Sequence, residues 1–331
     1  MAHLVTPPRV FIDTCHLSGI LCAQRGESVP NDRDDSRTAA YQRLNSWLRD
    51  GICSPVWCEL LAAEWIRHED AERARKYARI LDAAPQVFEF DPGAAVAQAE
   101  CLNECRRIRP ALEIPRFEIV RPIAIVRPLL ALMSQHHPDW NEAASTIGLK
   151  MPPGPPPEAS VEMFVEAYIC LSPVNAKARE VGVKGDKFAF DTTKATQQDC
   201  SPEKIFSDST IKYWVLNALQ LKDLLTAVDP ECNPEQIVEQ IDLRKCPGLC
   251  FYYRLYDKFV RSKKAYDDPH DLIDHAFIPG LCYCDHALVD KRVRDLIEQV
   301  QRDSVGREVT AASDPRNLVS AISALLNDSV A

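Results

Sequence analysis

The chain has 331 residues, of which 46% are hydrophobic and 26% charged, a balance typical of a globular protein with a sizeable core. No apolar run approaches the ~20 residues of a membrane-spanning helix, so we expect no membrane partner. The net charge of −9 argues mildly against a nucleic-acid partner, because phosphate binding depends on Lys and Arg. The 13 cysteines are scattered and follow no secretory leader, which predicts reduced thiols and a cytoplasmic location.

Residues 9–15, RVFIDTC, predict a short apolar strand that ends at Asp13, followed by a helix packed on it. Ligands of α/β sheets bind beyond the carboxyl ends of the strands, so Asp13 stands where a site would form. Residues 38–50 then predict an amphipathic helix that stops at Gly51. Its inward side chains are expected to be Tyr41, Leu44, Trp47 and Leu48.

The next segment, ICSPVWCELLAAEW, predicts a strand over 52–54, then Pro55 and a helix that carries Glu59 and Glu64. Because these two residues are five apart, they point in different directions on a helix. We expect only one to join a common site and the other to face solvent. QVFEFD adds a strand and Pro92-Gly93 starts a helix, an alternation that predicts a mostly parallel sheet.

The middle of the chain, 101–262, changes character and predicts a proline-punctuated, mostly helical insertion. Its clearest helix covers 207–228. We therefore expect 1–100 and 263–303 to form one split α/β domain, with 304–331 as a C-terminal helix that begins at Asp314-Pro315. The insertion is the expected surface for self-association or a protein partner.

Residues 244–264 carry seven basic residues against one acid, with five aromatic residues among them. Such a segment suits a phosphodiester ligand, but it is equally typical of an amphipathic helix with a solvated cationic face. The candidate nucleic-acid-binding residues are Arg254, Lys258, Arg261, Lys263 and Lys264.

Residues 267–290 are rich in aspartate and run directly on from the basic segment. Asp271 and Asp274 share one face of a predicted helix that Pro279-Gly280 ends, and Leu281–Val289 predicts a strand with Asp285 near its start and Asp290 after its end. Clustered carboxylates repel one another unless a cation neutralises them, and oxygen ligands favour Mg²⁺ or Mn²⁺. An acid in the first turn of a helix, such as Asp271, is equally an ordinary complement to the helix dipole.

Four pieces, VFIDTC, ICSPVWCEL, DLIDHA and YCDHALVDKRV, occur in an order that resembles the PIN-domain nuclease superfamily. The resemblance implies a three-layer α/β/α, PIN-like fold and hydrolysis of phosphodiester bonds, in RNA more than in DNA, with Mg²⁺ or Mn²⁺. It gives the catalytic positions to Asp13, Glu59, Asp271 and Asp290. Asp13, Asp271 and Asp290 would bind metal, and Glu59 would bind it or orient the attacking water.

Further metal candidates are Asp274 and Asp285, and secondary site candidates are Glu64, Thr14 and His275. Two features depart from the family: the long insertion, and Val289 before the last acid, where many members carry Thr or Ser.

Three other interpretations remain open. A non-catalytic PIN-like scaffold or RNA-binding subunit would share the fold. A haloacid-dehalogenase-like phosphatase would also place an acid at Asp13, but it needs a second aspartate where Cys15 stands. A zinc site is the third, although its four thiols lack the usual spacing. These are Cys246, Cys250, Cys282 and Cys284.

Overall fold

The computed structural model describes residues 6–30, 32, 34–67, 70–123, 159–169, 208–217, 219–261, 277–302 and 309–328. Within them the chain forms one sheet in the order β4-β3-β2-β1-β5-β6, parallel throughout except where β4 pairs with β3. The strands are β1 (Arg9–Ile12), β2 (Ser54–Trp57), β3 (Phe88–Glu89), β4 (Arg121–Pro122), β5 (His286–Leu288) and β6 (Ala311–Ala312). The predicted α/β class with a mostly parallel sheet is confirmed.

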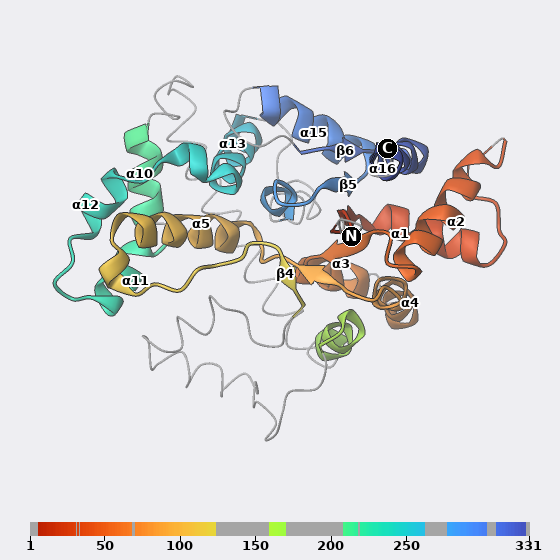
Figure 1. Ribbon diagram of the computed structural model, residues 1–331, viewed down its shortest axis with the longest axis horizontal. Helices are drawn as coiled ribbons and strands as arrows, with labels where there is room; N and C mark the ends of the chain where they lie inside the picture. The colour runs from red at the N-terminus through yellow and green to blue at the C-terminus, as the bar shows by residue number, and fades with distance from the viewer. Residues whose placement is uncertain are drawn as a thin grey trace.

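Helices cover both faces of the sheet and give three layers (Figure 1). Those near the sheet are α1 (Thr14–Gln24), α2 (Ser36–Arg49), α3 (Glu59–Arg67), α4 (Ala71–Asp82), α5 (Gly93–Ile108), α13 (Pro247–Arg261), α15 (Lys291–Arg302) and α16 (Pro315–Asp328). Phe11 on one face contacts Phe90 and Phe277, with ring centroids 5.8 and 5.2 Å away. Trp57 on the other face contacts Phe164, 5.6 Å away.

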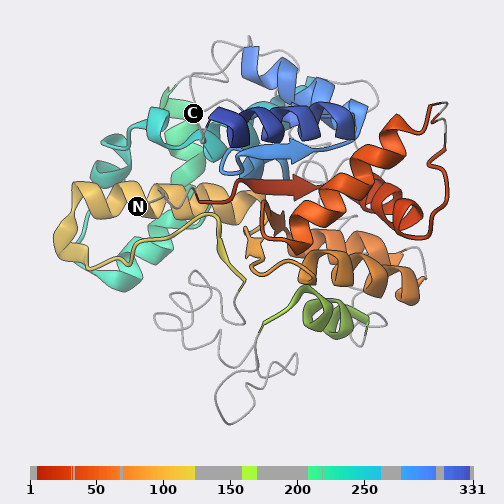
Figure 2. The same ribbon diagram turned by 45° about the vertical axis from the view of Figure 1, so that its right-hand side comes forward.

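The middle strands are buried because the layers enclose them. Val10, Phe11 and Ile12 of β1 are at most 1% exposed, as expected for a central strand of a parallel sheet. Figure 2 shows the red β1 and the blue β5 side by side and pointing the same way. The carboxyl ends of these two strands therefore meet at one edge of the sheet.

The second strand lies two residues later than the sequence predicted, and it contains Pro55. The Ser54 N–H donates to the Pro8 carbonyl on the β1 side. Because backbone N–H groups alternate in direction along a strand, the backbone nitrogen of Pro55 faces β3. Pairing with β3 begins only at Val56, so the N–H that proline lacks is not needed there.

A second apolar core lies among the helices on the left of Figure 1. It joins α5 and α13 to α10 (Asp208–Asn217), α11 (Leu221–Val228) and α12 (Pro234–Glu239), with the short 3₁₀ turns η1 (Pro110–Leu112) and η2 (Leu243–Lys245) beside them. The single helix predicted over 207–228 is wrong, because Gln220 adopts a left-handed φ of 54° between α10 and α11.

Three features of the described residues show which segments pack on the sheet and which on the second core. The second core begins inside α5, at Ala97, rather than at 101. Arg121 of β4 and the helix of residues 161–169 belong to the sheet domain, the latter through an ion pair between Arg75 and Glu166. The C-terminal segment supplies β6 as well as α16, and α16 packs on α2 and β5, so it is part of the same sheet domain.

The helix predicted to end at Pro279-Gly280 ends one residue later, since residues 277–281 are helical and a turn follows. Gly280 lies against the ring of Phe90, and a Cβ at Gly280 would overlap that ring. Phe90 is fully buried and has no room to move away. Glycine at 280 therefore permits the close approach of this helix to the sheet.

We expect Gly280→Ala to lower the free energy of unfolding by about 1–3 kcal/mol, the usual cost of overpacking. Chemical denaturation measures the change. Phe90→Leu in the same chain removes part of the obstacle, so the double variant should lose less than the sum of the two single variants. Additive losses would contradict the steric explanation.

Candidate active site

The site is built at the carboxyl ends of β1 and β5, the two neighbouring parallel strands in the middle of the sheet. Asp13 follows β1 directly, and Asp290 follows β5 after one residue, Val289. The backbone N–H of Asp13 donates to the Leu288 carbonyl at 2.9 Å, which ties the two strand ends together. The structure therefore brings Asp13 and Asp290 to one place, as the sequence predicted.

Asp13 is buried, with 7% of its surface exposed, and it caps α1 by accepting the Thr14 N–H at 2.7 Å. Burial and, less strongly, the negative charge of Asp290 together raise the pKa of its carboxyl group to about 6, against the lowering effect of the Thr14 N–H. The Asp290 backbone N–H also donates to this carboxylate. Asp13 is thus a costly buried acid held beside a second acid.

Asp290 is half-buried and caps α15, since its Oδ1 accepts the Val293 N–H at 2.7 Å. The N-termini of α1 and α15 therefore both point at this pair of carboxylates. Helix N-termini carry partial positive charge, which favours negative groups at this edge. The fold offsets part of the repulsion between Asp13 and Asp290 in this way.

A buried histidine fixes the backbone just before Asp290. His16 Nε2 lies 3.0 Å from the Val289 carbonyl, and its Nδ1 lies 2.8 Å from the Tyr41 hydroxyl. Because a carbonyl only accepts, Nε2 carries the proton and Tyr41 donates to Nδ1. Burial lowers the pKa of His16, so the ring is held neutral as a link between α1, α2 and the end of β5.

Glu64 is half-buried and lies beside Asp13 through Thr14. The Thr14 hydroxyl donates to Glu64 Oε2 at 3.0 Å and accepts the indole N–H of Trp65 at 3.0 Å. The pKa of the Cys15 thiol is raised, first by lost hydration and then by negative charge nearby. The charged groups responsible are Asp13, Asp290 and Glu64.

The other predicted site residues fall into three groups. Glu59 begins α3 just past the end of β2, so it starts at the same edge of the sheet as Asp13. Asp285 lies at the opposite edge, where its Oδ2 accepts the Arg9 N–H at 2.8 Å. Four residues of strand separate the two edges by about 13 Å, so Asp285 does not join Asp13 as a metal ligand. The candidates that lie outside the described residues are Asp271, Asp274, His275, Lys263 and Lys264.

Within the described ranges, no three His, Cys, Asp or Glu side chains are grouped closely enough to hold a metal ion. Asp13 and Asp290 provide two carboxylates of the right kind for Mg²⁺ or Mn²⁺, and buried like charges are what a divalent cation neutralises. All the described cysteines are free thiols, and the proposed zinc ligands Cys246, Cys282 and Cys284 are buried in the core.

The basic and aromatic segment forms α13, which packs against α5 and α15. Phe251 and Tyr253 are buried, at 2% and 6% exposed, so these two rings belong to the core, as in an amphipathic helix. Arg254 is half-buried. Lys258 and Arg261 lie on the last two turns of the helix, where the structure does not describe the side chains.

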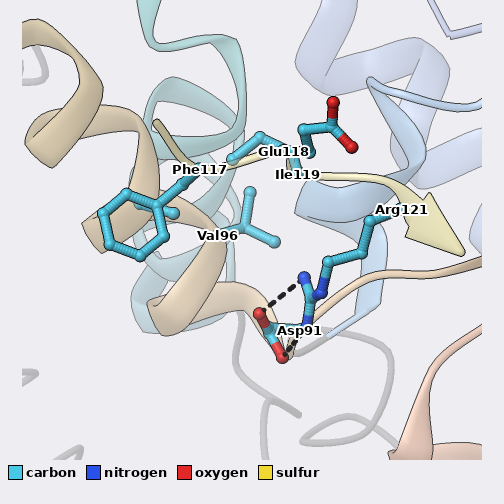
Figure 3. Close-up of a pocket in the computed structure, with 7 residues that line it drawn as sticks. Asp91, Val96, Phe117, Glu118, Ile119 and Arg121 are labelled. Atoms are coloured by element: carbon cyan, nitrogen blue, oxygen red, sulfur yellow. Dashed lines mark hydrogen bonds and ion pairs between the residues drawn. The ribbon is translucent and has the colours of Figure 1, made fainter. Parts of the chain in front are cut away.

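A second acidic cluster, Glu89 and Asp91 at the carboxyl end of β3, is neutralised by Arg121 (Figure 3). Arg121 contacts Asp91 through two nitrogens, at 2.9 and 3.0 Å, and Glu89 at 3.2 Å. Val96 and Phe117 help to line a hollow beside it with room of about 10 Å³, enough for one water molecule. This cluster holds β4 against β3 and is too small for a substrate.

Sequence reasoning missed Glu100, which is 2% exposed on α5. Its carboxylate accepts the N–H groups of Gly248 and Leu249, both at 2.7 Å, and the hydroxyl of Tyr283. Burial raises its pKa to about 7, against the lowering effect of these three donors. The only signal in the sequence is an acid within the apolar stripe of a helix, since Val96 and Glu100 are four apart.

None of the helices that the structure describes is long and apolar enough to cross a membrane. No protein-family model, curated protein or solved structure matches this chain, so the function has to be argued from the site itself.

Proposed function

We propose that the protein is a metal-dependent nuclease that hydrolyses phosphodiester bonds, in RNA more than in DNA. One observation carries the proposal: Asp13 and Asp290 stand together at the ends of adjacent parallel strands, and each lies at a helix N-terminus. A scaffold does not need a buried acid with its pKa raised to about 6 beside a second acid. The preference for RNA, and the PIN-like assignment, come only from the resemblance of the motifs.

In this proposal Asp13 and Asp290 hold Mg²⁺ or Mn²⁺, with Asp271 and Asp274 as further candidates by motif. When bound, such an ion lowers the pKa of water and neutralises charge on the phosphate. Glu64 shares the hydroxyl of Thr14 with Trp65, so its carboxylate is fixed and suited to accept a proton from the attacking water. Glu59, which starts at the same edge, is the alternative for this role. We place the protein in the cytoplasm, which its free thiols support.

A cleavage assay tests the proposal directly. Fluorogenic RNA and single-stranded DNA of the same sequence are incubated with the full chain and Mn²⁺ or Mg²⁺, with and without EDTA. We expect RNA cleavage that requires the metal and that EDTA abolishes. Nucleic-acid binding without cleavage under every metal condition would favour a non-catalytic, RNA-binding subunit instead.

A further inference from the structure

Arg73, near the start of α4, is held in place beside the proposed site by two hydroxyl groups. Its Nε donates to the Tyr77 hydroxyl oxygen at 2.5 Å, and its Nη2 donates to Ser18 Oγ at 3.0 Å. The guanidinium carbon also lies 5.5 Å from the centre of the Tyr77 ring. Arg73 is an exposed residue, and its bond to Ser18 lies at the surface, so the cation is fixed yet accessible from solvent.

The hydroxyl groups form a chain with one direction. Ser18 donates its proton to the Thr14 carbonyl at 3.2 Å, so the 2.5 Å contact between Ser18 and Tyr77 is a donation from the tyrosine. Both oxygens are then left as acceptors for Arg73. Two of the five guanidinium N–H groups are used in this way, and three remain for a ligand.

The neighbouring arginines of α4 pair with carboxylates, whereas within the described part of the chain the Arg73 side chain does not. Arg75 bonds to Glu166 at 2.5 and 3.1 Å, and Arg79 bonds to Glu162 at 2.9 Å. Among the residues that the structure describes, the side chain of Arg73 has hydroxyl partners alone. Its charge is therefore available to an anion from outside.

Arg73 is connected to the proposed site through α1 and α3. Ser18 is one helical turn, about 5.4 Å along α1, beyond Thr14, and Thr14 adjoins Asp13. Trp65, which donates to Thr14, packs edge-on against Tyr77 with ring centres 5.5 Å apart. Figure 1 shows α1, α3 and α4, which carry these residues, grouped on the right. One rigid cluster thus joins the cation to the carboxylates.

We propose that Arg73 binds a backbone phosphate of the nucleic acid, next to the phosphate that is cleaved. This inference rests on the proposed function, because it assumes that the nucleic acid cleaved at Asp13 and Asp290 also passes Arg73. A guanidinium suits the task, since it donates two parallel hydrogen bonds to phosphate. In a chain of net charge −9, a fixed cation beside acids is what would draw a polyanion to this edge.

Binding of a fluorescein-labelled 12-residue oligonucleotide, as RNA and as DNA of one sequence, tests the proposal. Anisotropy is measured in EDTA, so that cleavage plays no part, at several salt concentrations. We expect Arg73→Gln to weaken binding roughly tenfold, the effect of a hydrogen bond to a charged group, and to reduce the salt slope by about 0.7. Arg75→Gln, the matched control on the same helix, should change affinity by less than about twofold, because Glu166 already occupies its charge.

Each outcome decides something different. If wild type binds and Arg73→Gln binds equally well, the inference about Arg73 is wrong while the proposed nuclease stands. If Arg73→Gln weakens binding but wild type cleaves nothing with metal, the phosphate site stands and the proposed enzyme falls. If wild type binds neither oligonucleotide in EDTA, the inference about Arg73 is overturned, and the cleavage assay with metal decides the proposed nuclease separately. Thermal unfolding of each variant shows whether packing is lost. Arg73→Lys keeps the positive charge but lacks the paired donors of a guanidinium, so it separates the effect of charge from that of hydrogen bonding.

Discussion

Asp13→Asn and Asp290→Asn are expected to reduce metal-dependent cleavage by 100-fold to 1,000-fold or more. The size follows from the several kcal/mol of charge stabilisation that a bound divalent ion supplies, at about 1.4 kcal/mol for each factor of ten in rate. Asparagine keeps an oxygen that can cap α1 or α15, so both variants should fold. Initial rates with RNA and Mn²⁺ measure the loss, and circular dichroism checks the fold.

Asp285→Asn is the matched control for this experiment. It makes the same substitution beside the same two strands, but at the opposite edge of the sheet, where an amide oxygen still accepts the Arg9 N–H. Its rate should stay within about twofold of wild type, as for a substitution away from the site. Folded Asp13→Asn and Asp290→Asn proteins that cleave at the wild-type rate would overturn the proposed function. An equal loss in Asp285→Asn would remove the argument for this edge.

Asp13→Asn should also change the free energy of unfolding. Above pH ~6 the variant should be at least as stable as wild type, although its activity is lower. In wild type without metal, the folded pKa of about 6 lies above the ordinary value of 3.8, so the folded state binds the proton more tightly. Stability from this group is therefore present below pH ~4 and is lost as the pH rises to ~6, by up to about 3 kcal/mol. The variant lacks this loss, and at pH 8 it should unfold at an equal or higher denaturant concentration than wild type.

The central features of the site could be predicted from local sequence alone. An apolar strand followed by Asp13 and then a helix is a local pattern, and the structure has β1 and α1 where they were expected. A parallel sheet then places the carboxyl ends of neighbouring strands together. What local patterns lack is the order of the strands, which the pairing of β1 with β5 supplies.

Contacts between distant segments decided the rest. The sequence predicts that Glu59 and Glu64 lie on one helix, but it does not show which of them faces the site. The hydrogen bond between Thr14 and Glu64, 50 residues apart, is what holds Glu64 beside Asp13. The strands β4 and β6 have two residues each, too few for an alternating pattern to be visible. The sequence left two interpretations of residues 244–264 open, and the packing of α13 on α5 and α15 is what buries Phe251.

Glu100 gives the second large effect, and it concerns stability rather than catalysis. Its carboxylate caps the N-terminus of α13 from the neighbouring helix, and Gly248 is required there, because a Cβ would contact Val96 and Glu100. Glu100→Ala leaves two buried N–H groups and one hydroxyl without their acceptor. At about 1–3 kcal/mol for each unsatisfied group, we expect a loss of roughly 3–6 kcal/mol in the free energy of unfolding.

The pH dependence separates the charge of Glu100 from its shape. Its folded pKa of about 7 lies above the ordinary 4.5, so its contribution is fully present below pH ~4.5 and declines as the pH rises to ~7, by about 3 kcal/mol. Glu100→Gln stays neutral and avoids this decline, although its amide turns one donor toward a backbone N–H. The variant should therefore be less stable than wild type at pH 5, and the difference should shrink or reverse at pH 8.

Urea denaturation of both proteins at the two pH values measures this, and the difference between them cancels the titration of Asp13. Glu104→Gln, one turn along α5, is the control for neutralising a buried glutamate whose charge is already paired, with Arg107 at 2.9 Å. A gap between wild type and Glu100→Gln that is the same at pH 5 and pH 8 would mean that Glu100 keeps one protonation state throughout. The carboxylate would then act only as a fixed acceptor, and the acid side of the stability profile would have to come from Asp13.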